Sequence, residues 1–265
     1  MKFPALFVSH GAPSLLLDDG PAAHFLKSLG QKFPKPKAVI CVSAHWEARE
    51  PLFTTSERLD TIHDFYGFPE AMYQMRYPAK GSSELAQRAL ALCKSAGVNA
   101  GLESSRGLDH GAWIPLMAMY PEVDVPVIQV ALPFAQGPRA VFALGQALSP
   151  LRDEGVLLLG SGGFTHNLGA LAWGGGETPI WAKEFHVWAS TALRENRRED
   201  LLEAETRAPH FRQNHPRTEH WLPLYFALGA AGSPWNCETL YTGFEFGSLA
   251  MDAFAFTPSA GLDTA

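Results

Sequence analysis

Three histidines each come after an apolar run that is typical of a strand buried on both faces. They are His10 after residues 5–8, His45 after residues 39–43 and His166 after residues 156–159. Because parallel strands end at the same edge of a sheet, and ligands bind at that edge in open α/β folds, we expect these imidazoles to lie close together. Imidazole is the commonest protein ligand of metal ions and titrates near neutral pH, so the pattern indicates metal binding or proton transfer. One histidine at a strand end is usually structural, but three make coincidence the weaker explanation.

Two later segments add candidates. Asp109 and His110 stand between glycines, which suggests a tight loop that points a side chain inward. His220 opens an apolar helix whose burial would fix its position, and Glu219 beside it is a candidate carboxylate ligand. His210, His215 and His220 are spaced by fives, which does not place two ligands on one helical face, so we expect a polar surface loop around His210.

The glycine-rich stretch from Gly160 to Leu168 does not match three familiar motifs. A dinucleotide fingerprint would need glycine where Thr165 stands, and both the Walker lysine and a G-x-S-x-G nucleophile elbow are missing. Phosphate binding and serine hydrolysis therefore lose support. We expect the glycines to let the backbone turn tightly, so that His166 faces a site.

A long aromatic segment, residues 50–78, follows the strand that carries His45. Loops of this length inside a compact domain are usually functional, so this one is a candidate pocket wall. Four aromatic side chains near the histidines are candidates for substrate binding: Trp46, Phe65, Tyr66 and Trp113. Such residues are more often part of the core, but a flat aromatic substrate would stack on any that line a cavity.

The elements that must position these residues alternate between strand and helix along the chain. Helices are expected from about Pro21, Ser83, Ile114, Pro138, Pro179 and Trp221. No repeat and no shift in composition marks a linker. We therefore predict a single α/β catalytic domain over residues 1–265, with a central, mainly parallel or mixed sheet flanked by helices. The polar tail from about residue 258 is expected to fray.

Composition narrows the class of partner. The formal charge is −6, and the sequence has no long cluster of basic residues that could bind a phosphate backbone. Nucleic acid and anionic membranes are therefore not expected partners. No stretch is long enough to span a bilayer. The three cysteines are far apart and lack a Cys-x-x-Cys spacing, which favours a reducing cytoplasm over a disulfide framework. The oligomeric state stays open, and a homo-oligomer is compatible with the sequence.

Seven short motifs, taken in order, resemble the class III extradiol ring-cleaving dioxygenases, and within them the 4,5-DOPA extradiol dioxygenase type. Any one of them is weak, but the ordered set is specific and spans almost the whole chain. They are residues 9–13 (SHGAP), 42–46 (VSAHW), 61–65 (TIHDF), 67–69 (GFP), 108–111 (LDHG), 162–168 and 219–224 (EHWLPL).

The resemblance implies a non-haem metal held by His10, His45 and a group from the 219–220 turn. We favour His220 over Glu219 as that group, with His166 either coordinating or standing close. His110 resembles the family's acid/base histidine, and His110 and His166 are the candidates for proton transfer. Fe(II) with three protein ligands keeps positions open for a catechol and O₂, and the ring would open to a muconic semialdehyde.

Two other functions remain open at this point. An all-histidine site also suits zinc, which could be the native metal or be acquired during purification, and a zinc hydrolase could use the same cluster to activate water. A non-catalytic interaction protein could also have kept the fold and the pocket. An Fe(II) enzyme acting on a small aromatic diol and O₂ is the leading hypothesis.

Overall fold

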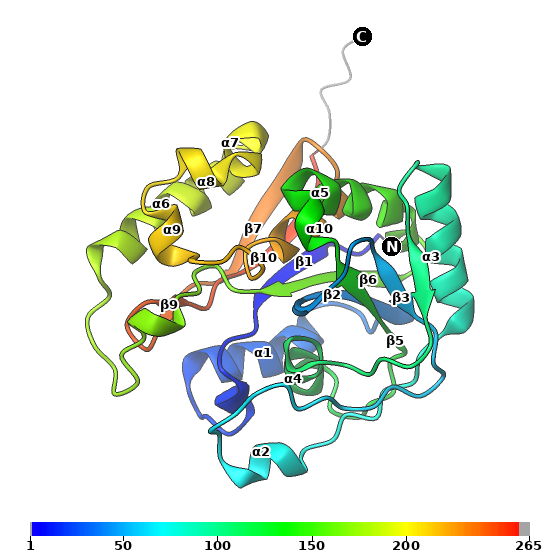
Figure 1. The fold of residues 1–265 in the computed structure, drawn as a ribbon, viewed down its shortest axis with the longest axis horizontal. Coiled ribbons are helices and arrows are strands. Elements are labelled where there is room, and N and C mark those ends of the chain that lie inside the picture. Colours follow the sequence, from blue (N-terminus) through cyan, green and yellow to red (C-terminus); the bar gives the residue numbers. More distant parts are fainter. Residues whose placement is uncertain (1, 260–265) are drawn as a thin grey trace.

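The computed structural model describes residues 2–259, which form one α/β domain around an eight-stranded sheet (Figure 1). The strand order is β4-β3-β5-β2-β6-β1-β10-β7. The strands are β1 (Ala5–Ser9), β2 (Ala38–Glu47), β3 (Leu52–Thr54), β4 (Gly101–Glu103), β5 (Val127–Leu132), β6 (Val156–Gly162), β7 (Trp235–Tyr241) and β10 (Ala253–Pro258), and a separate hairpin pairs β8 (Phe244–Glu245) with β9 (Leu249–Ala250).

The centre of the sheet is parallel and its margins are mixed. Strands β5, β2, β6 and β1 run parallel, whereas β10 and β7 add antiparallel partners beyond β1. At the other margin β3 pairs antiparallel with β5 and parallel with β4. The predicted α/β domain with a mainly parallel or mixed sheet is therefore confirmed.

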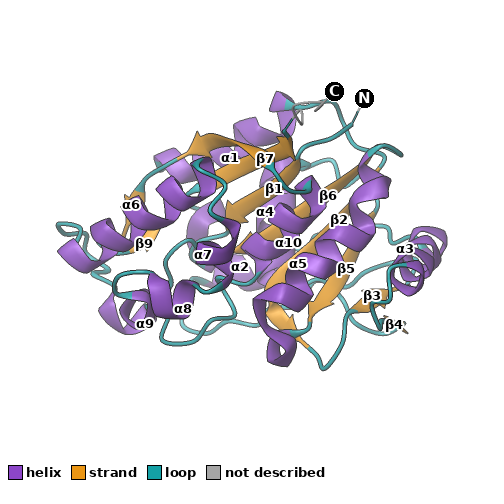
Figure 2. Cartoon of the chain, turned by 90° about the horizontal axis from the view of Figure 1, so that it is seen from above, coloured by secondary structure: helices purple, strands orange, loops and turns teal. Residues whose placement is uncertain are grey.

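Helices cover both faces of the sheet (Figure 2). One layer holds α1 (Pro21–Lys32), α2 (Glu70–Gln74) and α4 (His110–Met119), and the other holds α3 (Ser83–Ser95), α5 (Gly137–Leu148), α6 (Ile180–Arg194) and α10 (Pro223–Ala231). Shorter helices are η1 (Pro13–Leu16), η2 (Phe134–Gln136), η3 (Ser149–Arg152), η4 (Leu168–Ala170), α7 (Arg198–Leu202), α8 (Ala204–Arg207) and α9 (Phe211–Asn214).

Strand β2 shows how the sheet separates the two cores. Val39 and Cys41 pack into the core with α1 and α4, whereas Ile40 and Val42 pack into the core with α5 and α10. Successive side chains of a strand point to opposite faces, so an unbroken apolar run is what a strand covered on both sides requires. The same alternation determines which residues near His45 face the same side of the sheet as its imidazole.

The glycines of β6 serve close packing rather than a tight turn. The strand continues through Gly162, and a Cβ on Gly162 would lie 2.2 Å from the backbone oxygen of His220. A Cβ on Gly160 would lie 2.1 Å from the backbone oxygen of Pro223. The expected turn at these glycines is therefore wrong. Their missing side chains let the turn that carries His220 lie directly on the sheet.

The C-terminal tail departs in part from expectation. Pro258 is still the last residue of β10, and the backbone N–H of Ser259 donates to the carbonyl of Pro234 at 3.0 Å. The rest of the stretch expected to fray, residues 260–265, lies outside the described residues. Within residues 2–259, no helix has both the length and the apolar character needed to cross a membrane.

Candidate metal centre and substrate cavity

Five imidazoles from five segments meet at the carboxyl edge of the sheet. They are His10 just after β1, His45 near the end of β2, His110 at the first position of α4, His166 after β6 and His220 in the turn before α10. All five line one cavity of about 670 Å³. The structure thus brings together every histidine that the sequence suggested for metal binding or proton transfer.

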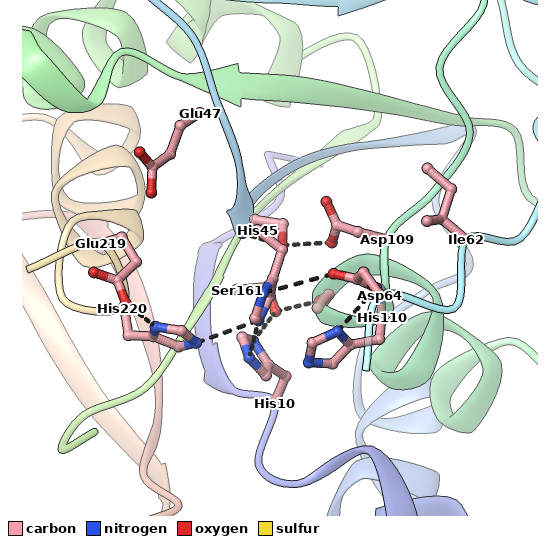
Figure 3. Close-up of polar contacts among 12 residues, drawn as sticks. His10, His45, Glu47, Ile62, Asp64, Asp109, His110, Ser161, Glu219 and His220 are labelled. Carbon is pink, nitrogen blue, oxygen red and sulfur yellow. Dashed lines mark hydrogen bonds and ion pairs between the residues drawn. The ribbon is translucent and has the colours of Figure 1, made fainter. Parts of the chain in front are cut away.

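The imidazole of His45 lies at the middle of this cluster. Its Nε2 is 3.1 Å from Nε2 of His10 and 3.2 Å from Nε2 of His220 (Figure 3). Donor atoms of His10, His45 and His110 all lie within 4.8 Å of one another. The Nε2 atoms of His10, His45 and His220 therefore point toward one common place.

The Nδ1 atoms of these three rings face away from that point, toward hydrogen-bond partners or a carboxylate. His220 Nδ1 lies 2.9 Å from Glu219 Oε1, and His45 Nδ1 lies 3.6 Å from Asp64 Oδ2. His10 Nδ1 lies 3.1 Å from Oγ of Ser161, whose hydroxyl hydrogen is donated to the carbonyl of Gly111. These hydrogen bonds favour the proton on Nδ1 of His10 and of His220, and the charge of Asp64 favours the same tautomer of His45, which leaves the Nε2 lone pairs facing the common point.

Three converging Nε2 lone pairs could hold a cation, and the spacing fits a metal ion. Two nitrogens that would each lie about 2.0–2.1 Å from one metal are roughly 2.9–3.4 Å apart, for angles between a right angle and the tetrahedral angle. The two Nε2 separations around His45 fall within this range. The donor set is wholly imidazole, and the orientation of each ring is fixed from behind, as is usual for metal-binding histidines.

The surroundings also keep these imidazoles in the neutral form that binds metals. Burial lowers the pKa of His10 and of His220 well below the usual value, and the charges of neighbouring histidines lower each further. Burial, followed by the charge of His110, lowers the pKa of His45 to about 3, although Asp64 opposes the shift. The cluster therefore offers lone pairs rather than protons at neutral pH.

Asp64 connects His110 to His45 and was not singled out from the sequence. Its Oδ1 accepts from the backbone N–H of His110 at 2.9 Å and lies 3.0 Å from His110 Nδ1. Burial alone would raise the pKa of the Asp64 carboxyl, but His110 and His45 lower it to about 2. The tight loop expected at His110 is the first turn of α4, and Asp64 binds its first N–H.

A buried polar network supports this part of the site. Asp109 is fully buried and accepts from Ser43 Oγ at 2.7 Å and from the side-chain amide of Gln129. Burial raises the pKa of its carboxyl, and the charge of Asp64 adds to the rise. Ser43 also accepts from the backbone N–H of His45 at 3.2 Å, so the network holds the end of β2 beside α4.

His166 lies flat against His220, with ring centroids 3.4 Å apart and planes 8° from parallel. The lone pair of an imidazole nitrogen lies in the plane of its ring. Because the two rings are nearly parallel and stacked, the lone pairs of His166 and His220 cannot both point at one ion. Burial lowers the pKa of His166 to about 4, and its backbone N–H donates to the carbonyl of Asn214 at 3.0 Å.

Glu219 acts behind the cluster rather than within it. Its Oε1 lies against the Nδ1 of His220, on the side of that ring away from His45. Burial raises the pKa of this carboxyl, and Arg217 opposes the rise. This geometry supports His220 over Glu219 as the donor contributed by the turn.

The four candidate aromatics divide evenly between cavity and core. Phe65 and Tyr66 line the cavity, and Tyr66 is 91% exposed. Trp46 follows His45 on β2, so it points to the opposite side, where the guanidinium of Arg106 stacks on it. Trp113 is fully buried within α4 and donates its indole N–H to the carbonyl of Ile62 at 2.9 Å. The expectation that Trp46 and Trp113 line a cavity is therefore wrong.

The rest of the cavity wall is mostly apolar. Phe68, Leu171 and Leu249 contribute to it, and Trp173 lies at its edge with 58% of its surface exposed. The loop expected to be polar around His210 is only partly so, because His215 is fully buried among aromatic rings. His215 contacts the carbonyl of Phe164 and is not part of the cavity lining.

Comparison with known proteins identifies the family. The family described as "Catalytic LigB subunit of aromatic ring-opening dioxygenase" matches residues 4–250. The chain belongs to this family. The family predicted from the sequence is thus confirmed. The match to a catalytic subunit disfavours the alternative of an interaction protein without catalysis.

Relatives of this LigB-family chain extend over nearly its whole length. It is 42% identical to "4,5-DOPA dioxygenase extradiol" of Beta vulgaris, covering 95% of each chain. It is 37% identical to the protein of the same name from Escherichia coli (strain K12), covering 94% of this chain and 93% of that one. A crystal structure of an uncharacterised E. coli K12 protein superposes with a TM-score of 0.81 at 32% identity, covering 96% of this chain and 99% of that chain.

Proposed function

We propose that this enzyme is a non-haem Fe(II)-dependent extradiol dioxygenase that opens the ring of a DOPA-like catechol with O₂. The observation that carries the proposal is the convergence of three Nε2 atoms, from His10, His45 and His220, in a cavity partly lined by aromatic side chains. These three histidines would hold the iron. When bound, Fe(II) supplies the redox path between catechol and O₂ that zinc lacks.

The remaining side chains bind the substrate and move its protons. Nδ1 of His110 faces the Asp64 carboxylate, so its Nε2 is free to accept a proton from a catechol hydroxyl. His166 presents a second neutral imidazole at the cavity wall and is our candidate for the other proton transfer. Phe65 and Tyr66 offer aromatic surfaces on which the ring would stack.

The reaction balance is simple. Both atoms of O₂ enter the product, the carbon–carbon bond beside the diol breaks, and a muconic semialdehyde is released. No external reductant is consumed. The apolar part of the wall, including Phe68 and Leu249, would contact the ring of the bound catechol.

A zinc hydrolase is the second candidate, favoured by the all-histidine donor set. It predicts activity with zinc and no dependence on oxygen. A panel of catechols that includes DOPA, added to protein reconstituted anaerobically with Fe(II) and then exposed to air, separates the two. We expect a yellow ring-opened product, and no product from any catechol would contradict the proposal.

A further inference from the structure

An ion pair on the cavity wall is not used by the proposed chemistry. Arg217 forms a bidentate pair with Glu47, with Nη1–Oε1 and Nη2–Oε2 distances of 2.6 Å each. The guanidinium also stacks on the ring of Phe134, 4.4 Å from its centroid. Both partners line the cavity, where 56% of the Arg217 side chain and 30% of the Glu47 side chain are exposed.

Arg217 and Glu47 contact fewer histidines than the other charged side chains that line the cavity, Asp64 and Glu219. Within the described chain, Arg217 is the one lysine or arginine that lines it. Asp64 is engaged by His110, and Glu219 is engaged by His220 and lies 3.6 Å from Nη1 of Arg217. The carboxylate of Glu47 contacts Arg217 alone. A guanidinium has five N–H donors, so the pair leaves Arg217 with donors for a further acceptor.

The pair is attached to the segments that carry the converging imidazoles. Glu47 stands two residues after His45, and Arg217 stands three residues before His220. In Figure 3, Glu47 and Glu219 lie on one side of the imidazole cluster and His110 lies on the other. A ring bound at the cluster with a hydroxyl near His110 would therefore direct a substituent toward Glu47 and Arg217.

We propose that Arg217 and Glu47 select catechols that carry an α-amino acid head group, with Arg217 binding the carboxylate and Glu47 the ammonium. The inference rests on the proposed function. A zwitterion presents one charge of each sign, so it can pair with both ions and leave neither without a partner. Catechols with a single charge on the side chain satisfy only one of them, and an uncharged side chain satisfies neither.

Four catechols that differ in side-chain charge test this selection: DOPA, dopamine, 3-(3,4-dihydroxyphenyl)propionate and 4-methylcatechol. Their binding to zinc-loaded protein is measured by calorimetry without oxygen, so no turnover is needed. Arg217→Met should weaken DOPA and the propionate about 10- to 100-fold, because a charge-assisted hydrogen bond is lost. Glu47→Gln should weaken DOPA and dopamine instead, and 4-methylcatechol should change less than about twofold in both variants.

Arg139→Met is the matched control, because it breaks an exposed pair with Glu199 away from the cavity. It should leave all four affinities unchanged. An equal loss for all four catechols in Arg217→Met would overturn the inference, since it would mean that the pair only holds the two segments together. Unchanged binding of DOPA would overturn it as well.

Failure of the proposed function gives a different result. A wild-type protein that binds these catechols in the predicted order but never opens a ring with iron and oxygen would refute the dioxygenase proposal while supporting charge selection. Binding of none of the four would refute both.

Discussion

The imidazole of His166 is stacked on that of His220, with 3.4 Å between the ring centroids. Because one ion cannot lie in both ring planes, His166→Ala should retain stoichiometric metal, whereas His220→Ala should lose it. The His166 variant should still lose roughly 10²- to 10⁴-fold in kcat if its imidazole transfers a proton. Metal analysis after dialysis, followed by steady-state kinetics, checks both. Equal loss of metal in the two variants would make His166 a ligand.

Asp64 should control the proton transfer assigned to His110. Asp64→Asn removes the carboxylate that faces Nδ1 of His110, so the ring is no longer held with Nε2 free. We expect kcat to fall about 10- to 100-fold, as for other residues that orient catalytic or ligating histidines, and its pH profile to shift. Asp60→Asn, an exposed change in the same loop, is the control. A profile identical to wild type would rule out this role.

Gly111 keeps space for the imidazoles. A Cβ there would lie 2.4 Å from Ser43 Oγ and 2.9 Å from Cδ2 of His45. Gly111→Ala should therefore displace the His45 ring and weaken metal binding at least about 10-fold, since small errors in ligand position are costly. Gly174→Ala, where nothing lies within 4 Å, should bind metal normally. Competition with a chelator measures both affinities, and normal binding by the Gly111 variant would contradict the packing argument.

His215 should make the fold sensitive to acid. Burial lowers its pKa to about 3, well below the value near 6.5 of an unfolded chain. Protonation therefore favours unfolding, so its contribution is fully present above about pH 6.5 and is lost as the pH falls toward 3, by about 1.4 kcal/mol per pH unit. In metal-free protein, His215→Phe should flatten the dependence of unfolding free energy on pH between 6 and 4 by about one proton. Urea titrations would show parallel curves if His215 were protonated in the folded state.

Local sequence patterns were sufficient for the sheet and for the histidines at strand ends. An unbroken apolar run identifies a strand covered on both faces, and the shared edge of parallel strands brings His10 and His45 together. The same alternation explains the error at Trp46, because adjacent residues on β2 cannot both face the cavity. The His166 stack could not be read from its motif, since it depends on how closely the 219–220 turn approaches Gly162.

Contacts between residues far apart in the sequence could not be predicted from local patterns. Glu47 and Arg217 are separated by 170 positions in sequence, and nothing near either residue indicates the other. Asp64 lies in a segment identified as a candidate wall, but its contact with His110 depends on how that loop folds back onto α4. Such contacts follow from tertiary packing, which periodicity and spacing do not encode.

Oxygen consumption by Fe(II)-loaded protein with DOPA, measured beside a zinc-loaded control, tests the central claim most directly. We expect uptake of one O₂ for each ring opened with iron and no uptake with zinc, because redox-inactive zinc cannot pass electrons from catechol to oxygen. Turnover by the zinc protein without oxygen, or catechol binding to the iron protein without oxygen uptake, would contradict the dioxygenase account.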